Sequence, residues 1–128
     1  MNRAKIIKDE IFEENRRFFA IFIETRNACL VLLSEAEDNL GTLVVAIPPE
    51  KGLIGPFASS TLLGTRHSTL AKILAEKIAS KKGKIALVSI HLKTLQETEA
   101  GPILGRLVEK IMEKHENLTE REVEGALA

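Results

Sequence analysis

The sequence predicts an α+β domain in which a single, mostly antiparallel sheet is covered by two amphipathic helices. Three observations lead to this fold class. The first half of the chain holds four or five short apolar segments of strand-like composition, and the second half has the order helix, strand, helix. The length of 128 residues suits one domain with one core, and no linker divides the chain.

Three apolar segments in the first half are predicted to be strands. Residues 17–24 are apolar on both faces, which is typical of a central strand. A tight turn connects them to a second strand at 28–33, and so short a connection predicts an antiparallel hairpin. An acidic turn leads to a third strand at 40–47, which two prolines end.

Two further segments flank these strands. Residues 50–57 contain two glycines and a proline and are predicted to be a loop. A short strand follows at 58–63 and is bounded by Gly64. The segment 5–12 fits a helix by the spacing of its isoleucines, and it fits an edge strand equally well.

The first helix is expected to end at Lys82, and Thr65 or Ser68 can cap its start. Lys81 and Lys82 suit the negative end of the helix dipole, and Gly83 suits a left-handed cap. One stripe is expected to face the sheet, with two alanines beside it: Leu70, Ile73, Leu74, Lys77 and Ile78, flanked by Ala71 and Ala75.

After a strand at 85–90, the second helix is expected to begin near Gly101 and Pro102. A capping-box pattern at 119–122 predicts a short terminal helix. We therefore expect a domain over residues 1–118 and a short helix or tail over 119–128. The buried face of the second helix is predicted to be Ile103, Leu104, Leu107, Val108, Ile111 and Met112.

Composition limits the classes of function. The formal net charge is zero and the chain has neither Trp nor Tyr, so it lacks the basic footprint and the stacking rings of a nucleic-acid binder. Cys29 is the only cysteine, which fits a reducing compartment, and no apolar run is long enough to span a membrane. We expect a soluble cytoplasmic protein. Abundant Lys, Glu and Ile with almost no Gln indicate a thermophile.

The strands are too apolar for the face opposite the helices to be fully hydrated. A neutral chain also has little electrostatic repulsion between copies. We therefore expect a homodimer, and our hypothesis is that it buries this second face of the sheet.

No recognisable catalytic constellation is present, and we expect neither an enzyme nor a bound cofactor. Residues 64–68 join a strand to a helix, where amides can hold an anion, but the second glycine and the lysine of a phosphate loop are missing. His67 and Ser68 are adjacent on a helix and do not face each other, which disfavours a hydrolase. Ordinary helix capping explains this stretch best.

The remaining candidates have structural explanations. His67, His91 and His115 are widely spaced without a second ligand nearby, so we expect surface or helix-end histidines and no metal site. Cys29 is expected to be a small buried apolar residue. The lysines at 81, 82 and 84 form either a solvated helix end or a surface for an acidic partner.

Several stretches resemble the proteasome assembly chaperone 4 family. They are Ser59-Ser60-Thr61-Leu62-Leu63-Gly64, the helix at 70–79 with Lys81-Lys82-Gly83-Lys84 after it, the strand Ala86-Leu87-Val88-Ser89, and Leu107-Val108-Glu109-Lys110-Ile111. Together they cover a little under half of the chain. The apolar strands upstream agree in pattern and order only.

The resemblance implies one sheet with two flanking helices, and it favours a strand at 5–12. It also implies a non-catalytic protein without cofactors that binds proteasome α-subunits and promotes assembly of the α-ring. Because the eukaryotic proteins act as pairs, an archaeal version is expected to be a homodimer. The expected contact is the most family-like stretch, with Ser60, Thr61, Gly64, Thr65 and Arg66. Core packing alone does not require the identity of Ser60, Thr61, Gly64 or Arg66.

An alternative shares the same layout of one sheet with covering helices. It is a dimeric regulatory module of the roadblock or profilin-like kind that binds a small GTPase or a ligand. Layout alone does not fix function. Capture of proteasome α-subunits from a lysate would favour the first hypothesis, and capture of a GTPase would favour the second.

Overall fold

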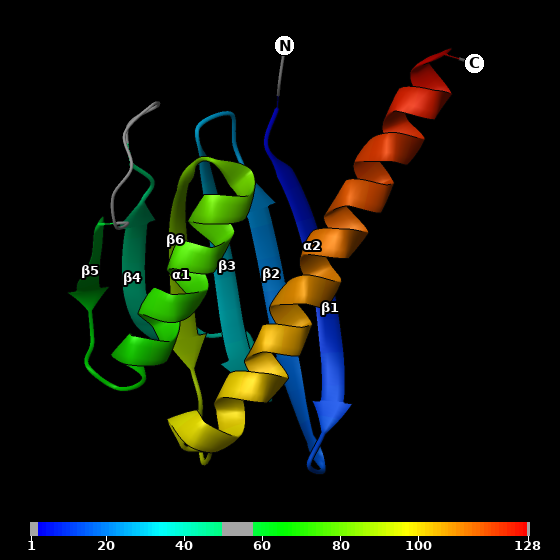
Figure 1. Ribbon diagram of the computed structural model, residues 1–128. Coiled ribbons are helices and arrows are strands. Elements are labelled where there is room, and N and C mark those ends of the chain that lie inside the picture. The colour runs from blue at the N-terminus through cyan, green and yellow to red at the C-terminus, as the bar shows by residue number, and fades with distance from the viewer. Residues whose placement is uncertain (1–2, 50–57, 128) are drawn as a thin grey trace.

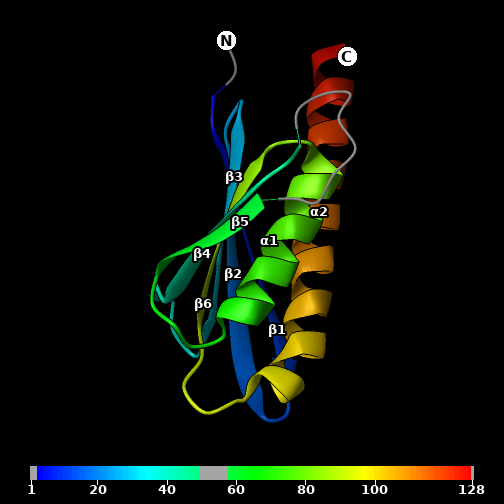
Figure 2. The same cartoon turned by 60° about the vertical axis from the view of Figure 1, so that its left-hand side comes forward.

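The computed structural model describes residues 3–49 and 58–127, with side chains up to residue 117. Six strands form one sheet, and two helices lie on the same face of it (Figures 1 and 2). The elements are β1 (Lys5–Glu13), β2 (Arg16–Glu24), β3 (Ala28–Glu35), β4 (Thr42–Ile47), β5 (Ala58–Leu63), α1 (Ser68–Lys82), β6 (Ile85–His91) and α2 (Glu97–Leu127).

The predicted α+β class is confirmed. The strand order is β1-β2-β3-β6-β4-β5, and every neighbouring pair is antiparallel except β3 with β6. The predicted hairpin of β2 and β3 is present, and the three other predicted strands agree to within about two residues at each end. The predicted loop at 50–57 lies outside the described residues.

The ambiguous segment at 5–12 is a strand. It pairs along its whole length with β2, from Lys5 opposite Glu24 to Glu13 opposite Arg16. The two residues of the connecting turn, Glu14 and Asn15, have positive φ angles of 55° and 60°. Two left-handed residues match the twist of a tight hairpin, which holds β1 in register with β2.

The core lies between the helices and the face of the sheet that they cover. Helix α1 packs over β4 and β6, and α2 crosses β1 and β2 (Figure 1). Every second residue of the central strands points into this layer, as the pleat requires. The largest fully buried side chains are Phe18, Phe22, Val31, Leu33, Val44, Ile78, Val88, Ile90, Leu104, Leu107, Ile111 and Met112.

The predicted buried face of α2 is confirmed, and that of α1 is confirmed except at two positions. Ile73 is 57% exposed and Lys77 is also exposed. The buried stripe is centred between Leu70, Leu74 and Ile78 on one side and Ala71, Ala75 and Ala79 on the other. Alanines let the helix backbone lie close to the sheet, and this turns Ile73 towards solvent.

The ends of the helices differ from the prediction in three respects. Neither Thr65 nor Ser68 caps α1, because His67 occupies the cap position with φ 61° and makes no side-chain capping bond. Helix α2 begins at Glu97, where Glu97 and Glu99 suit the positive end of its dipole. It continues to Leu127, so the residues after 118 extend α2 and do not form a separate helix. Gly83 does provide the predicted left-handed cap of α1, with φ 65°.

The face of the sheet opposite the helices, here called the open face, is apolar at its centre. The side chains there alternate with the buried set and are only half-buried. More strongly exposed apolar side chains surround them, at Ile6, Phe12, Ile47 and Leu63. The centre of the open face consists of Phe19, Ile21, Ile23, Leu30, Leu32, Leu43, Val45 and Leu87.

Candidate functional site

The five residues predicted to contact a partner form one continuous exposed stretch at a corner of the molecule. Ser60 and Thr61 belong to β5, the strand at one edge of the sheet. Gly64, Thr65 and Arg66 form the connection from β5 to α1. All five are exposed. The stretch is therefore accessible, as a contact surface requires.

Gly64 has a structural role that the sequence did not reveal. Its φ of 78° is in the left-handed region, and a Cβ atom there would lie 2.7 Å from Oγ1 of Thr42. Both the backbone angle and the close approach to β4 require glycine. Gly64 is therefore needed for the backbone conformation of this connection, although it is exposed and is not part of the core.

A surface hollow of about 410 Å³ lies beside this connection. It takes in the ends of β4 and β6 together with the start of α1. Three of the predicted residues line it, and Ser60 and Thr61 do not. Its lining is Leu40, Gly41, Thr42, Gly64, Thr65, Arg66, His67, Ile90, His91 and Leu92.

The lining of the hollow carries basic and polar groups but no carboxylate among the described residues. Arg66 forms no ion pair with any other residue in the described part of the chain. The first turn of α1 contains no acidic residue and no side-chain cap, so its amides add positive potential. The hollow is therefore suited to an acidic group of a partner.

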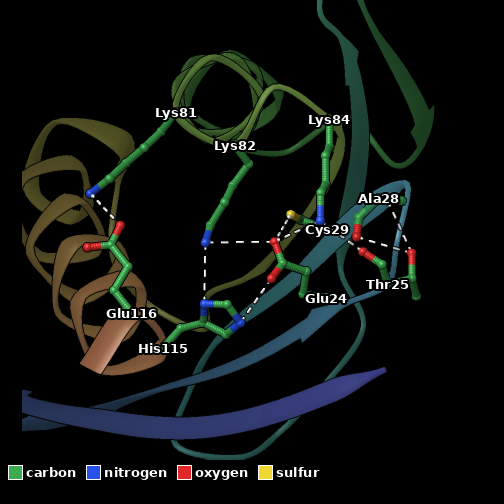
Figure 3. Close-up of polar contacts among 9 residues, drawn as sticks. All are labelled: Glu24, Thr25, Ala28, Cys29, Lys81, Lys82, Lys84, His115 and Glu116. Atoms are coloured by element: carbon green, nitrogen blue, oxygen red, sulfur yellow. Dashed lines mark hydrogen bonds and ion pairs between the residues drawn. The ribbon is translucent and has the colours of Figure 1, made fainter. Parts of the chain in front are cut away.

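Lys81 and Lys82 at the end of α1, and Lys84 after it, do not form a separate surface patch. Figure 3 shows Lys82 and Lys84 converging on the carboxylate of Glu24, at the end of β2. The Nζ atoms lie 3.7 Å and 3.2 Å from Oε2 of Glu24. Lys81 lies 3.8 Å from Glu116 of α2. All three lysines thus form ion pairs with carboxylates of the same chain. This differs from both predicted arrangements, a solvated helix end and a surface for an acidic partner.

His115 of α2 completes this cluster, and it is buried, so the expectation of a surface or helix-end histidine is wrong for it. Its Nε2 lies 3.0 Å from Oε1 of Glu24, and its Nδ1 lies 3.3 Å from Nζ of Lys82. Because an ammonium group only donates, Nδ1 accepts and the ring proton of neutral His115 is on Nε2, facing Glu24. The ring also packs against Phe22, with centroids 5.0 Å apart.

The pKa shifts in this cluster have clear causes. Burial alone raises the pKa of Glu24, but Lys82, Lys84 and His115 outweigh it and the net pKa is lowered. Burial, followed by the nearby charge of Lys82, lowers the pKa of His115. Burial and then Glu24 raise the pKa of the Cys29 thiol to about 11, so this buried cysteine stays protonated, as expected of a small apolar residue. In this cluster Glu24 is therefore a charged carboxylate, and His115 is a neutral imidazole.

Within residues 3–49 and 58–117, no group of His, Cys, Asp and Glu side chains is arranged to hold a metal ion. His67 and His91 line the hollow, whereas His115 lies in the Glu24 cluster. Of the helices described, none has the length and apolarity needed to cross a bilayer.

Comparison with known proteins finds a similarity in structure but not in sequence. No protein-family model matches the sequence, and no curated protein is significantly similar to it. A chain from the "Crystal Structure of a Novel Chaperone Complex for Yeast 20S Proteasome Assembly" does match in structure, with a TM-score of 0.67. The match covers 89% of this chain and 96% of that chain, at 15% sequence identity. The two chains therefore share a fold over nearly their whole lengths.

Proposed function

We propose that this protein is a non-catalytic assembly chaperone that binds proteasome α-subunits and promotes formation of the α-ring. The observation that carries the proposal is the nearly full-length match to a chain of a yeast 20S proteasome assembly chaperone complex. A fold alone does not fix function. The sequence resemblance on β5, α1 and α2 points independently to the same class of protein.

The site proposed for the α-subunit is the exposed stretch of Ser60, Thr61, Gly64, Thr65 and Arg66. Its position at the edge of the sheet leaves it accessible in a monomer. Ser60 pairs with Val45 and so lies next to the open face, whereas Gly64, Thr65 and Arg66 lie in the connection beyond β5. Gly64 shapes this stretch, and Arg66 supplies its charge.

Arg66→Glu is expected to weaken binding of the recombinant proteasome α-subunit at least about tenfold, because it reverses the charge beside the hollow. Calorimetry measures the binding, and circular dichroism checks that the variant is folded. The matched control is Arg26→Glu. Arg26 is equally exposed but lies in the β2–β3 turn, at the opposite end of the sheet (Figure 1).

Equal binding by wild type and a folded Arg66→Glu variant would remove Arg66 from the site. If the wild-type protein does not bind the α-subunit at all, the proposed function itself is wrong.

We also propose a homodimer in which the open faces of two copies pack together. The centre of this face is a continuous apolar surface that crosses β2, β3, β6 and β4, whereas Lys8 and Glu10 of β1 lie at its margin. Apolar patches of this kind on small proteins mark interaction sites. Self-association is the simplest way to cover it in a chain of zero net charge.

The wild-type protein is expected to be a dimer in light scattering at micromolar concentration, and Leu32→Lys is expected to be a monomer. Leu32 lies near the middle of the open face on β3, where a dimer would have to bury the new charge without a partner. Ile73→Lys, on the exposed face of α1, is the matched control and should remain a dimer. A monomeric wild-type protein would contradict this proposal.

A further inference from the structure

We propose that the free edge of β5 takes up an extended segment of the partner as an additional strand of the sheet. This inference rests on the proposed function, and it specifies how the same exposed stretch would hold an α-subunit. The segment contributes main-chain hydrogen bonds along β5 and a carboxylate beside Arg66.

Strand β5 has the properties of an open edge. Among the strands of residues 3–49 and 58–117 it pairs with β4 alone, and five of its six side chains are exposed. It contains no charged residue and no proline, two of the devices that protect an edge from another strand. Leu62 is 51% exposed and sits at the irregularity in the pairing with β4. Within residues 3–49 and 58–117, no side chain donates a hydrogen bond to the main chain of β5.

The opposite edge of the sheet, at β1, is blocked by the protein itself. Lys110 and Lys114 of α2 donate to the main-chain carbonyls of Glu10 and Lys8, at 2.9 Å and 2.8 Å. Their separation by two residues is that of groups on one side of a strand. Charged side chains follow along the same edge, where Lys110 contacts Asp9 and Arg106 pairs with Glu13. A sheet with one blocked edge and one open edge can be extended only at the open one.

The chemistry beside β5 indicates the composition of the segment. The strand leads at Gly64 directly into the basic hollow, where Arg66 has no ion-pair partner in the described part of the chain. An acidic side chain at that end of the added segment would pair with Arg66. Apolar side chains further along the segment would contact Leu62 and Leu63, which are both half-exposed. The partner is thus expected to present an extended, mainly apolar stretch that has a carboxylate at one end.

Hydrogen–deuterium exchange on the wild-type protein tests this inference, with the recombinant proteasome α-subunit as the probe. An added strand is expected to slow exchange of the amides of residues 58–63, because it supplies acceptors for those at the free edge. The amides of β1 (5–13) serve as the internal reference and should exchange unchanged.

Leu62→Lys provides a second measurement, since it places a charge on the open edge. It should weaken α-subunit binding at least about tenfold, the scale expected for loss of one buried leucine side chain. Ile73→Lys makes the same substitution at a similarly exposed isoleucine of α1 and should bind normally.

The outcomes separate the two proposals. If the wild-type protein binds the α-subunit but exchange at 58–63 is unchanged, strand addition is wrong and the proposed function stands. If Leu62→Lys does not fold, the exchange result on the wild type alone decides. If the wild type shows no binding, the proposed function is wrong, and the strand-addition inference falls with it.

Discussion

Replacement of Leu107 by alanine is expected to lower the free energy of unfolding by about 2–5 kcal/mol, the usual cost of a large-to-small change in a core. Leu107 is fully buried in the layer between α2 and the sheet. The layer is close-packed, so little can move in to fill the space that the side chain leaves. Leu74→Ala on α1 is expected to have a similar effect, because Leu74 is also buried.

Urea denaturation followed by circular dichroism measures this change. The matched control is Ile73→Ala, which removes a similar side chain from the exposed face of α1 and should cost less than about 1 kcal/mol. A loss below about 1 kcal/mol for Leu107→Ala would mean that the apolar stripe of α2 is not part of the core.

Most elements of this fold could be predicted because each carries its own local pattern of apolar residues. Leu104, Leu107, Val108 and Ile111 recur at helical spacing, and all four are buried. The continuous apolar runs of β2 and β3 likewise predict strands, but only the structure shows that Phe18, Phe22, Val31 and Leu33 face the core. Local patterns of this kind need no knowledge of the remaining structure.

What the sequence did not predict depends on which elements meet. The parallel pairing of β3 with β6 joins segments that are far apart in the chain, and no local signal specifies it. Helical spacing alone predicts that Ile73 faces the core. The direction of the buried stripe of α1, however, depends on how closely its alanines approach the sheet, and this cannot be read from the helix itself. The position of β5 at an edge, which leaves the candidate site accessible, is also a property of the strand order.

The cluster of Glu24, Lys82, Lys84 and His115 could not be predicted for the same reason, since it depends on which elements meet. Its members come from the end of β2, the end of α1, the short connection that follows α1, and the middle of α2. One signal could have indicated part of it, because His115 lies four residues after Ile111 and so continues the buried stripe of α2. A histidine in an apolar stripe requires polar partners, and those partners come from other elements.

Glu24→Gln is expected to lower the free energy of unfolding at pH 7 by about 2–3 kcal/mol. The carboxylate is only 15% exposed and is the common partner of Lys82, Lys84 and His115. Without its charge, Lys82 remains largely buried and lacks an anion, which costs more than the loss of a surface ion pair. The amide keeps the shape of the side chain, so the change tests the charge and not the packing.

The effect of Glu24→Gln should depend on pH in a defined direction. Because the pKa of Glu24 is lowered in the folded state, its charge stabilises the protein above the ordinary carboxyl value of 4.5, and this contribution is lost as the pH falls through the lowered folded pKa. The difference between wild type and variant should therefore shrink as the pH is lowered below 4.5. The lowered pKa of His115 adds a loss of stability below its ordinary value of 6.5, and this loss is larger in the variant, because the charge of Glu24 raises the pKa of His115 in the wild type.

Urea denaturation of both proteins at pH 7, 5.5 and 4, and at lower pH while folding stays reversible, measures this dependence. Lys81 pairs with Glu116 in a more exposed setting, so Glu116→Gln is the matched control and should change stability by less than about 1 kcal/mol at pH 7. An effect of Glu24→Gln that stays constant down to the lowest pH would show that the carboxylate charge does not stabilise the junction of β2, α1 and α2. If Glu24→Gln lowers the free energy of unfolding no more than the control does, the ion pairs of Glu24 stabilise the protein no more than ordinary surface pairs, although Glu24 is largely buried.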